Sequence, residues 1–248
     1  MGPQPHPAHS THAAYGVDGV DGRYDADEAY SAPVVVDRAS GAAGGDLVLR
    51  RAGPDFEIIS NGVFLMDTRN GRSERLLVRA ALEDVRGPAH VLIGGLGVGF
   101  SLAESLAATA RLPGSRVTVV ELEPAVIGWH RTYLRAYSAG ALDDPRVTVA
   151  CADLLDWLPA TRARFEAICL DIDNGPDWTV TDGNARLYGP AGLDLLAARL
   201  APGGTLAVWS AGAAPAFEQR LRGRFSSVEV RAVPAPHGEP DVIFLASR

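Results

Sequence analysis

The chain has 248 residues, of which 47% are hydrophobic, and its formal net charge at pH 7 is −7. This length can bury one substantial core together with a small accessory element. The acidic balance disfavours nucleic acid as a partner, because binding to phosphates requires a basic surface. No apolar run is long enough to span a membrane and no basic-then-apolar leader begins the sequence, so we expect a cytoplasmic protein without a membrane partner.

The beginning of the chain differs in composition from the rest. Residues 1–45 are rich in Gly, Ala, Pro, His and Asp and have no hydrophobic period, so we expect a disordered tail. Residues 46–72 contain three short strand patterns, at 47–51, 56–60 and 63–67, and the Asn-Gly turn at 61–62 is a strong hairpin signal. We therefore expect a small N-terminal β element at 46–72, followed by a catalytic domain at 73–248.

In the remainder of the chain, strand patterns alternate with helix patterns. Helices are expected at 73–85, 100–111, 123–137, 153–159, 185–200 and 213–222, and strands at 90–94, 116–121, 146–151, 165–171, 204–209, 225–232 and 241–246. Such alternation predicts a parallel sheet covered by helices on both faces. The connection between the last two strands is too short for a helical crossover, so these strands should pair antiparallel. The prediction is an α/β, Rossmann-like, seven-stranded sheet with one reversed strand near the C-terminus.

Cysteine usage and ligand spacing give no indication of a metal. Cys151 and Cys169 both lie in apolar strand-like runs, which favours buried reduced thiols over a disulfide. The sequence from residue 46 onward has no metal-ligand spacing, and the histidines of the N-terminal segment are interpreted as solvated. We therefore predict a site without a metal.

A glycine run follows the first strand of the alternating region. Gly94, Gly95, Gly97 and Gly99 stand between that strand and a helix pattern, so backbone can approach a ligand closely there. The next strand ends in Glu121, and a carboxylate in that place can accept hydrogen bonds from both ribose hydroxyls. The spacing predicts a nucleoside site.

The order of the motifs indicates which protein family the chain resembles. A seven-stranded sheet with one reversed strand is the arrangement of class I S-adenosylmethionine-dependent methyltransferases. The hairpin with Asn61-Gly62-Val63-Phe64, then Gly94-Gly95, Glu121, Leu170-Asp171-Ile172-Asp173-Asn174-Gly175-Pro176, Leu187-Tyr188 and the segment 200–208 follow one another in the order of the spermidine synthase family. Over about residues 46–246 the chain resembles that family, which transfers an aminopropyl group from decarboxylated S-adenosylmethionine to a diamine.

The departures from the family pattern concern the donor and the amine. Polyamine-type members carry an aspartate inside the glycine run that helps to bind the primary amine of the donor, whereas Gly97 stands in that position here. Gly95, Gly97 and Gly99 instead have the Gly-x-Gly-x-Gly spacing of ordinary methyltransferases. The family segment that lines the amine site corresponds to residues 73–80, where its tyrosine and histidine are replaced. These differences favour intact S-adenosylmethionine as the donor.

Side chains that follow the carboxyl ends of the strands are the candidate catalytic and substrate-binding residues. Asp171 ends the fourth strand and is the candidate base that collects a proton from an amine acceptor, with Asp173 beside it; the alternative is that one of them only caps a turn. Asp171 is also a candidate to contact the cofactor. Tyr188 is a further catalytic candidate, and Asn174 and Trp178 are candidates to bind the substrate.

The base of the nucleoside has its own candidates. Asp153 matches the acid of the family that contacts adenine, and it is equally suited to be the N-cap of the helix that follows. Leu122 and Leu154 are candidates to enclose the ring, with core packing as the competing interpretation.

We interpret the chain as an S-adenosylmethionine-dependent transferase of the spermidine synthase-like branch, with methyl transfer to a small-molecule acceptor as the main reaction. The first alternative is a polyamine aminopropyltransferase that uses decarboxylated S-adenosylmethionine. A lyase or cyclase reaction on the aminocarboxypropyl chain of S-adenosylmethionine, and a cofactor-binding module without catalysis, are further alternatives. The resemblance also implies a homodimer.

Overall fold

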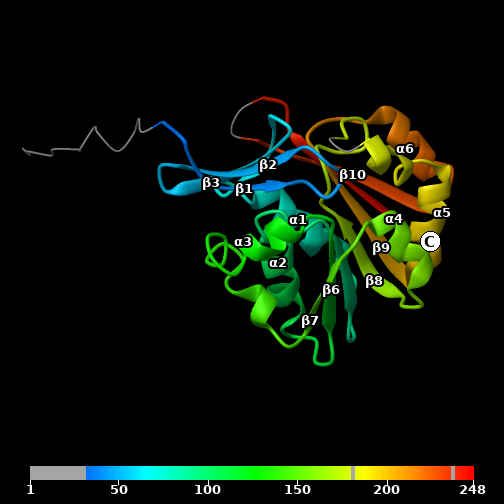
Figure 1. Ribbon diagram of the computed structural model, residues 1–248. Helices are drawn as coiled ribbons and strands as arrows, with labels where there is room; N and C mark the ends of the chain where they lie inside the picture. The colour runs from blue at the N-terminus through cyan, green and yellow to red at the C-terminus, as the bar shows by residue number, and fades with distance from the viewer. Residues whose placement is uncertain (1–31, 180–181, 236–237) are drawn as a thin grey trace, which may run out of the picture.

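The computed structural model describes residues 32–179, 182–235 and 238–248. The chain forms two sheets, one antiparallel and N-terminal, the other larger, mixed and flanked by helices (Figure 1). Among the described residues, no helix has the length and apolar character needed to cross a bilayer.

The N-terminal sheet is an antiparallel meander. It consists of β1 (Val34–Ser40), β2 (Asp46–Ala52), β3 (Asp55–Ser60) and β4 (Val63–Asp67) in chain order. One face of it is part of the main core, because Leu47, Leu49 and Ile58 are buried in the same cluster as the helices that follow.

Strand β1 lies within the segment for which we expected disorder, so that expectation is corrected for residues 34–40. The strand is largely exposed and therefore has no hydrophobic period. Its order comes from backbone pairing with β2 and from the indole of Trp129, which donates a hydrogen bond to Asp37 at 2.7 Å. Residues 1–31 of the expected tail lie outside the described residues.

The main sheet has seven strands in the order β10-β11-β9-β8-β5-β6-β7. Its strands are β5 (His90–Gly94), β6 (Arg116–Glu121), β7 (Val147–Cys151), β8 (Phe165–Leu170), β9 (Leu200–Ser210), β10 (Ser227–Val233) and β11 (Asp241–Ser247). Strand β11 is antiparallel to both of its neighbours, β10 and β9. The pairs β5–β6, β5–β8, β6–β7 and β8–β9 are parallel. The predicted seven-stranded sheet with one reversed strand is confirmed.

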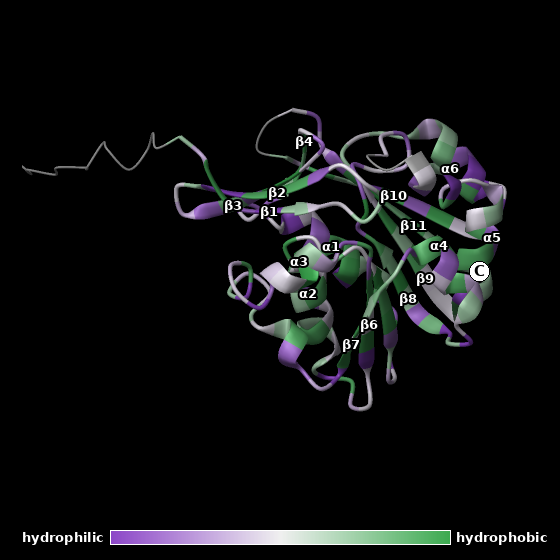
Figure 2. Cartoon of the chain, in the orientation of Figure 1, coloured by the Kyte–Doolittle hydropathy of each residue, from purple (hydrophilic) through white to green (hydrophobic). Residues whose placement is uncertain are grey.

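Helices cover both faces of this sheet (Figure 1). They are α1 (Arg72–Ala81), α2 (Phe100–Thr109), α3 (Pro124–Trp129), α4 (Leu154–Ala160), α5 (Pro190–Arg199) and α6 (Pro215–Arg222), with short 3₁₀ turns η1 (Ala141–Asp143) and η2 (Asp182–Arg186). Strand β5, between β8 and β6, contacts the helices on both faces, since Val91 and Ile93 pack with α1 and α2 whereas Leu92 packs with α4 and α5. The inner strands β5, β8 and β11 are accordingly apolar along most of their length (Figure 2).

Two helices are much shorter than expected. The helix expected at 123–137 ends at Trp129, and turns occupy the following residues because the His130 side chain folds inward against the glycine loop. The helix expected at 185–200 begins at Pro190, whose fixed φ and missing N–H suit the first helical turn.

Candidate active site

The glycine loop after β5 lies against the ends of two neighbouring strands. The backbone N–H of Gly95 donates to the carbonyl of Val120, at the end of β6, over 3.0 Å. Gly95 has a φ of +87°, and a Cβ atom there would lie 2.2 Å from the carbonyl oxygen of Asp171. Only glycine can both adopt this conformation and leave room for the strand beside it.

Gly97 faces the N-terminal sheet. Its φ is +50°, and a Cβ atom would lie 2.2 Å from the sulfur of Met66, which comes from β4. The same sulfur accepts a hydrogen bond from the N–H of Val98 at 3.2 Å. Met66 therefore fills the space next to the position where the polyamine-type pattern has an aspartate.

Glu121 ends β6 and is held by backbone donors. One carboxylate oxygen accepts from the N–H of Leu96 at 2.7 Å, and the other accepts from the N–H of Glu123 at 2.8 Å. The residue is buried, and burial raises the pKa of its carboxyl. These bonds fix the carboxylate at the edge of the cavity described below.

His130 stabilises the loop from behind, a role that the sequence analysis did not identify. Its Nε2 lies 2.8 Å from the carbonyl oxygen of Gly97, and its Nδ1 lies 3.2 Å from the hydroxyl of Ser138. With the proton on Nε2, the ring donates to Gly97 and accepts from Ser138, and burial lowers its pKa, which favours this neutral form.

Asp171 and Asp173 follow β8. The hydroxyl of Ser101, on α2, donates to Asp171 at 2.7 Å, and burial together with the charge of Asp241 raises the pKa of Asp171 to about 6. Asp173 has a left-handed backbone with φ of +54° and accepts a hydrogen bond from the side-chain amide of Asn184 at 2.8 Å. Both side chains are partly buried at the carboxyl edge of the sheet.

Glu74, in the first turn of α1, is a carboxylate that we did not predict as a site residue. It is buried, and the hydroxyl of Ser73 donates to it at 3.0 Å. Burial, followed by the charge of Asp171, raises its pKa to about 7. The signal in the sequence was its spacing, because Glu74 lies on the same buried helix face as Leu77 and Val78, three and four residues later.

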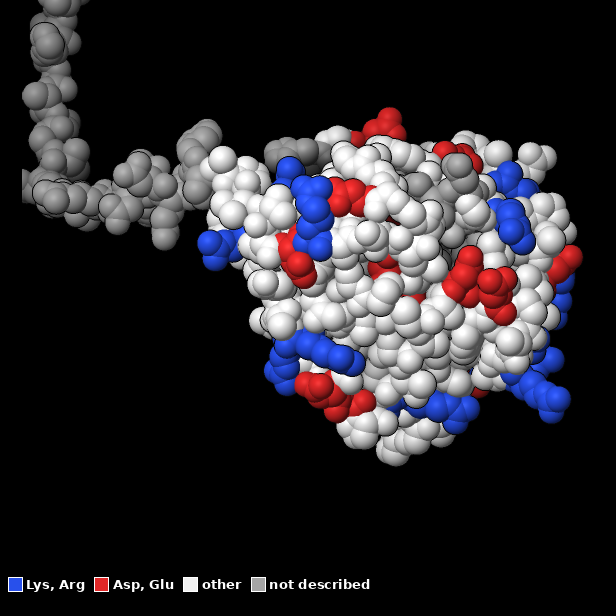
Figure 3. Space-filling view, in the orientation of Figure 1, with Lys and Arg blue, Asp and Glu red and all other residues white. Residues whose placement is uncertain are grey.

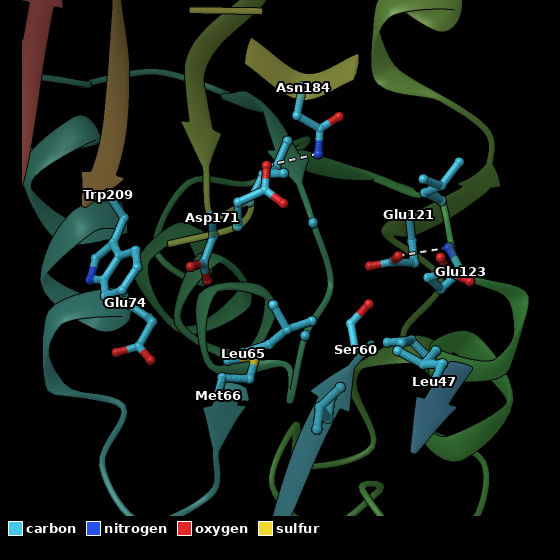
Figure 4. A pocket seen from close by; sticks show the side chains of 17 residues that line it. Leu47, Ser60, Leu65, Met66, Glu74, Glu121, Glu123, Asp171, Asn184 and Trp209 are labelled. Carbon is cyan, nitrogen blue, oxygen red and sulfur yellow. Dashed lines mark hydrogen bonds between the residues drawn. The ribbon is translucent and has the colours of Figure 1, made fainter. Parts of the chain in front are cut away.

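These side chains surround one hollow that is open to solvent and spans about 860 Å³, a volume that includes part of that solvent (Figure 4). It is lined by Leu47, Ile58, Ser60, Leu65, Met66, Glu74, Gly95, Gly97, Glu121, Leu122, Glu123, Val126, Asp171, Ile172, Asp173, Asn184 and Trp209. Five of these described residues are acids, and none is Lys, Arg or His. The N-terminal sheet supplies one wall, and a cationic ligand fits the charge of the lining.

A second, smaller hollow adjoins the first. Its lining adds Val120, Ala152, Asp153 and Leu154 to Gly95, Glu121, Leu122, Ile172 and Asn184, which line both. The carboxylate of Asp153 accepts from the N–H of Leu155 at 2.8 Å, so Asp153 is the N-cap of α4 while it lines this hollow. The two interpretations of Asp153 are therefore compatible.

The structure brings most of the predicted site residues together and separates others. Gly95, Gly97, Glu121, Leu122, Asp171 and Asp173 line the large hollow, and Asp153 and Leu154 the small one. Gly94 lies beneath Leu154 at the end of β5, and Gly99 is the N-cap of α2. Neither is among the residues that line a hollow.

Three other candidates do not line either hollow. The phenol of Tyr188 is buried and donates to the carbonyl of Ile172 at 3.2 Å, which places it behind the Asp171–Asp173 loop. Asn174 is buried, and its backbone carbonyl accepts from the N–H of Ala211. Trp178 is 60% exposed. Trp209, near the end of β9, packs against the core and also lines the large hollow.

Comparison with known proteins agrees with this arrangement. The chain is 37% identical over 186 residues to the polyamine aminopropyltransferase of Mycobacterium tuberculosis (strain ATCC 25618 / H37Rv), a match that covers 73% of this chain and 33% of that protein. It is 38% identical over 162 residues to polyamine aminopropyltransferase 1 of Streptomyces coelicolor, covering 63% of this chain and 28% of that one. The chain thus corresponds to about a third of the length of these relatives.

Solved structures share the fold at lower sequence identity. The spermidine synthase of Thermotoga maritima superposes with a TM-score of 0.68 and 17% identity, covering 86% of this chain and 72% of that one. A spermidine synthase in complex with the transition-state analogue AdoDATO also has a TM-score of 0.68, with 18% identity, covering 86% and 74% of the two chains. The model of the spermine/spermidine synthase domain matches residues 72–218, more than half of the chain, so the protein belongs to that family.

Proposed function

We propose that the protein transfers an aminopropyl group from decarboxylated S-adenosylmethionine to an amine. The observation that carries the proposal is the charge of the large hollow, whose described lining has five acids and no basic side chain. Intact S-adenosylmethionine carries a carboxylate that such a lining would repel. The decarboxylated donor has only its sulfonium and its ammonium, both of which the acids attract.

The relatives support the same reaction. Both curated relatives named above are polyamine aminopropyltransferases, and the two structural neighbours are spermidine synthases. This favours our first alternative over methyl transfer, which was our main interpretation. In the sequence analysis, Gly97 was the argument against aminopropyl transfer, because it replaces the aspartate that helps to bind the primary amine of the donor. Three other carboxylates, those of Asp171, Asp173 and Glu74, line the same hollow and can attract that amine.

The two hollows suggest how the donor lies. Glu121 lines both, so its carboxylate is suited to the ribose, and the small hollow with Asp153 and Leu154 is suited to the adenine. The carboxylate of Asp153 has a second oxygen that can accept from the exocyclic amine of the base. The sulfonium and its chain then lie in the large hollow, beside Gly95 and Gly97.

The reaction requires one proton transfer. The nitrogen of the acceptor attacks the carbon of the propyl chain next to sulfur, the carbon–sulfur bond breaks, and its electron pair stays on sulfur as methylthioadenosine. The acceptor nitrogen must lose a proton, and Asp171 is the proposed base, since a pKa of about 6 keeps it mostly ionised at pH 7.5 and able to receive that proton. Holding donor and acceptor in line supplies much of the acceleration.

The test is to identify the product. The protein is incubated with decarboxylated or with intact S-adenosylmethionine and 1,4-diaminobutane, and the nucleosides are separated by chromatography. We expect methylthioadenosine with the decarboxylated donor only. S-adenosylhomocysteine formed from the intact donor would replace the proposal by methyl transfer, and methylthioadenosine formed from the intact donor without acceptor would indicate the lyase or cyclase reaction.

A further inference from the structure

One peptide of the glycine loop is held from two sides. The carbonyl oxygen of Gly97 lies 2.8 Å from Nε2 of His130, and the N–H of the same peptide, which belongs to Val98, donates to the sulfur of Met66 at 3.2 Å. Met66 lines the large hollow, whereas His130 is buried and is not among the residues that line the two hollows. The peptide between Gly97 and Val98 is therefore fixed by Met66 on its hollow side and by His130 on its inner side.

Bonds from outside determine the conformation of this loop, because its glycines do not. Gly97 and Gly99 have φ values of +50° and +91°, and glycine populates such conformations about as readily as others. Gly99 also leaves room for the imidazole, since a Cβ atom there would lie 2.6 Å from Cε1 of His130. The ring is thus packed against the loop as well as bonded to it, and its loss would release the peptide.

The conformation of the loop determines how Glu121 is held. The N–H of Leu96 donates to its carboxylate at 2.7 Å. A further backbone hydrogen bond reaches the carboxylate from Gly97, where it opposes the effect of burial on the pKa of Glu121. Both donors lie directly before the Gly97–Val98 peptide, so a rotation of that peptide would displace them and the carboxylate with them.

The bond to Gly97 requires one protonation state of the ring. A carbonyl oxygen can only accept, so Nε2 must carry a proton to bond to Gly97. Nδ1 lies 3.2 Å from the hydroxyl of Ser138, which can donate to the ring, or can accept from it and donate to the carbonyl of Arg135, 3.3 Å away. Ser138 is therefore compatible with either tautomer of the imidazole, and Gly97 is the partner that selects Nε2–H.

We propose that His130 is a positioning residue for the donor: through its Nε2–H it orients the Gly97–Val98 peptide, and thereby keeps the carboxylate of Glu121 in place for the ribose. The inference rests on the proposed function for the position of the nucleoside beside Glu121. His130 is not part of the lining of the hollows, so it acts through the loop. Its loss should therefore weaken nucleoside binding without slowing the transfer once the donor is bound.

The test is calorimetry of methylthioadenosine binding to two variants that both remove the ring. In His130→Gln, the side-chain amide nitrogen can take the place of Nε2 and donate to Gly97, whereas the shorter side chain of His130→Asn extends only toward Ser138. We expect binding about tenfold weaker in His130→Asn, from the lost hydrogen bond to the loop, and within about threefold of the unaltered protein in His130→Gln. A merely structural role would weaken binding equally in both, because both lose the packing of the ring.

Two further variants are controls. Ser138→Ala keeps the bond between His130 and Gly97, and His90→Asn alters a partly buried histidine at the start of β5, away from the lining of both hollows. Both should bind methylthioadenosine as the unaltered protein does. In the aminopropyl transfer assay, His130→Asn should raise the KM for the donor about tenfold and leave kcat at saturating donor unchanged.

The protonation of the ring is measured directly by ¹⁵N NMR of the labelled protein without ligand. The imidazole signals of His130 are those that are missing in His130→Gln. We expect a proton on Nε2 and none on Nδ1 at pH 7.5, since only this tautomer donates to the carbonyl of Gly97.

The outcomes separate the two proposals. Equal affinities of His130→Gln and His130→Asn for methylthioadenosine, or a proton on Nδ1 of His130, would overturn the positioning role. Failure of the unaltered protein to bind methylthioadenosine would instead contradict the proposed function. The NMR measurement requires no ligand, so it would still test the bond to Gly97 in that case.

Discussion

The two ends of the large hollow hold their carboxylates in different ways. At the nucleoside end, both oxygens of Glu121 accept from backbone N–H groups. At the other end, Asp171 and Glu74 accept from the hydroxyls of Ser101 and Ser73. Backbone donors are fixed by the fold, whereas a serine hydroxyl rotates and can donate elsewhere. The carboxylate at the first end is therefore held in place by the backbone, whereas the hydrogen bonds at the second end can rearrange when the hydroxyls rotate.

The largest effect is expected for Asp171→Asn, which tests the second end. The amide keeps the shape and can still accept from Ser101, but it cannot take up a proton. We expect turnover to fall by about 10²- to 10⁴-fold, the usual contribution of a general base. Affinity for methylthioadenosine, measured by calorimetry, should change little. Asp177→Asn, in the exposed part of the same loop, is the control, and full activity of Asp171→Asn would reject Asp171 as the base.

The counterpart at the nucleoside end is Glu121→Ala. Loss of hydrogen bonds between a charged group and the ribose should weaken methylthioadenosine binding by about 1.5–3 kcal/mol, or roughly 10- to 150-fold. Removing the exposed carboxylate in Glu239→Ala should leave the affinity as it is. If Glu121→Ala binds methylthioadenosine as tightly as the unaltered protein does, Glu121 does not contact the ribose and the proposed position of the donor is wrong.

The smallest effect is a pH dependence of stability. Folding raises the pKa of Glu74 from its ordinary 4.5 to about 7, so between these values the folded protein binds a proton that the unfolded chain has released. Stability should therefore fall as pH rises through this window. In the unaltered protein, the free energy of unfolding measured with urea should decrease from pH 5 to pH 8. Glu74→Gln removes the contribution of Glu74, so this decrease should be about 2 kcal/mol smaller in the variant.

The exposed variant Glu83→Gln should keep the full slope of the unaltered protein. The same slope in Glu74→Gln would mean that Glu74 is not the buried proton-binding group. Asp171 contributes in the same direction, because its pKa is also raised, so a residual slope is expected after Glu74 is neutralised.

Much of the fold could be predicted from local patterns. The strands of the main sheet are apolar runs between turns, and the short link before β11 required the reversed direction. Strand β1 could not be predicted, because it faces solvent and is ordered by pairing with β2 and by the bond between Trp129 and Asp37. The early end of α3 has the same kind of cause, a tertiary contact between His130 and Gly97.

The site was predictable where it is built from strand ends. Glu121, Asp153 and Asp171 follow strands, and parallel strands present their carboxyl ends at one edge. Glu74 and Met66 reach the same hollow from α1 and β4, elements whose position depends on how the N-terminal sheet packs. Tyr188 was assigned to chemistry from its motif, whereas its hydroxyl lies behind the loop and bonds to Ile172.

The contact between Met66 and Gly97 couples two positions that are distant in the sequence. A side chain at position 97 would collide with the methionine sulfur, and removing the sulfur alone would leave the N–H of Val98 without its acceptor. Neither change is favourable by itself, so the effects of substitutions at 66 and 97 should be strongly non-additive. A smaller residue at position 66 should therefore make an aspartate at position 97 less destabilising than it is beside Met66.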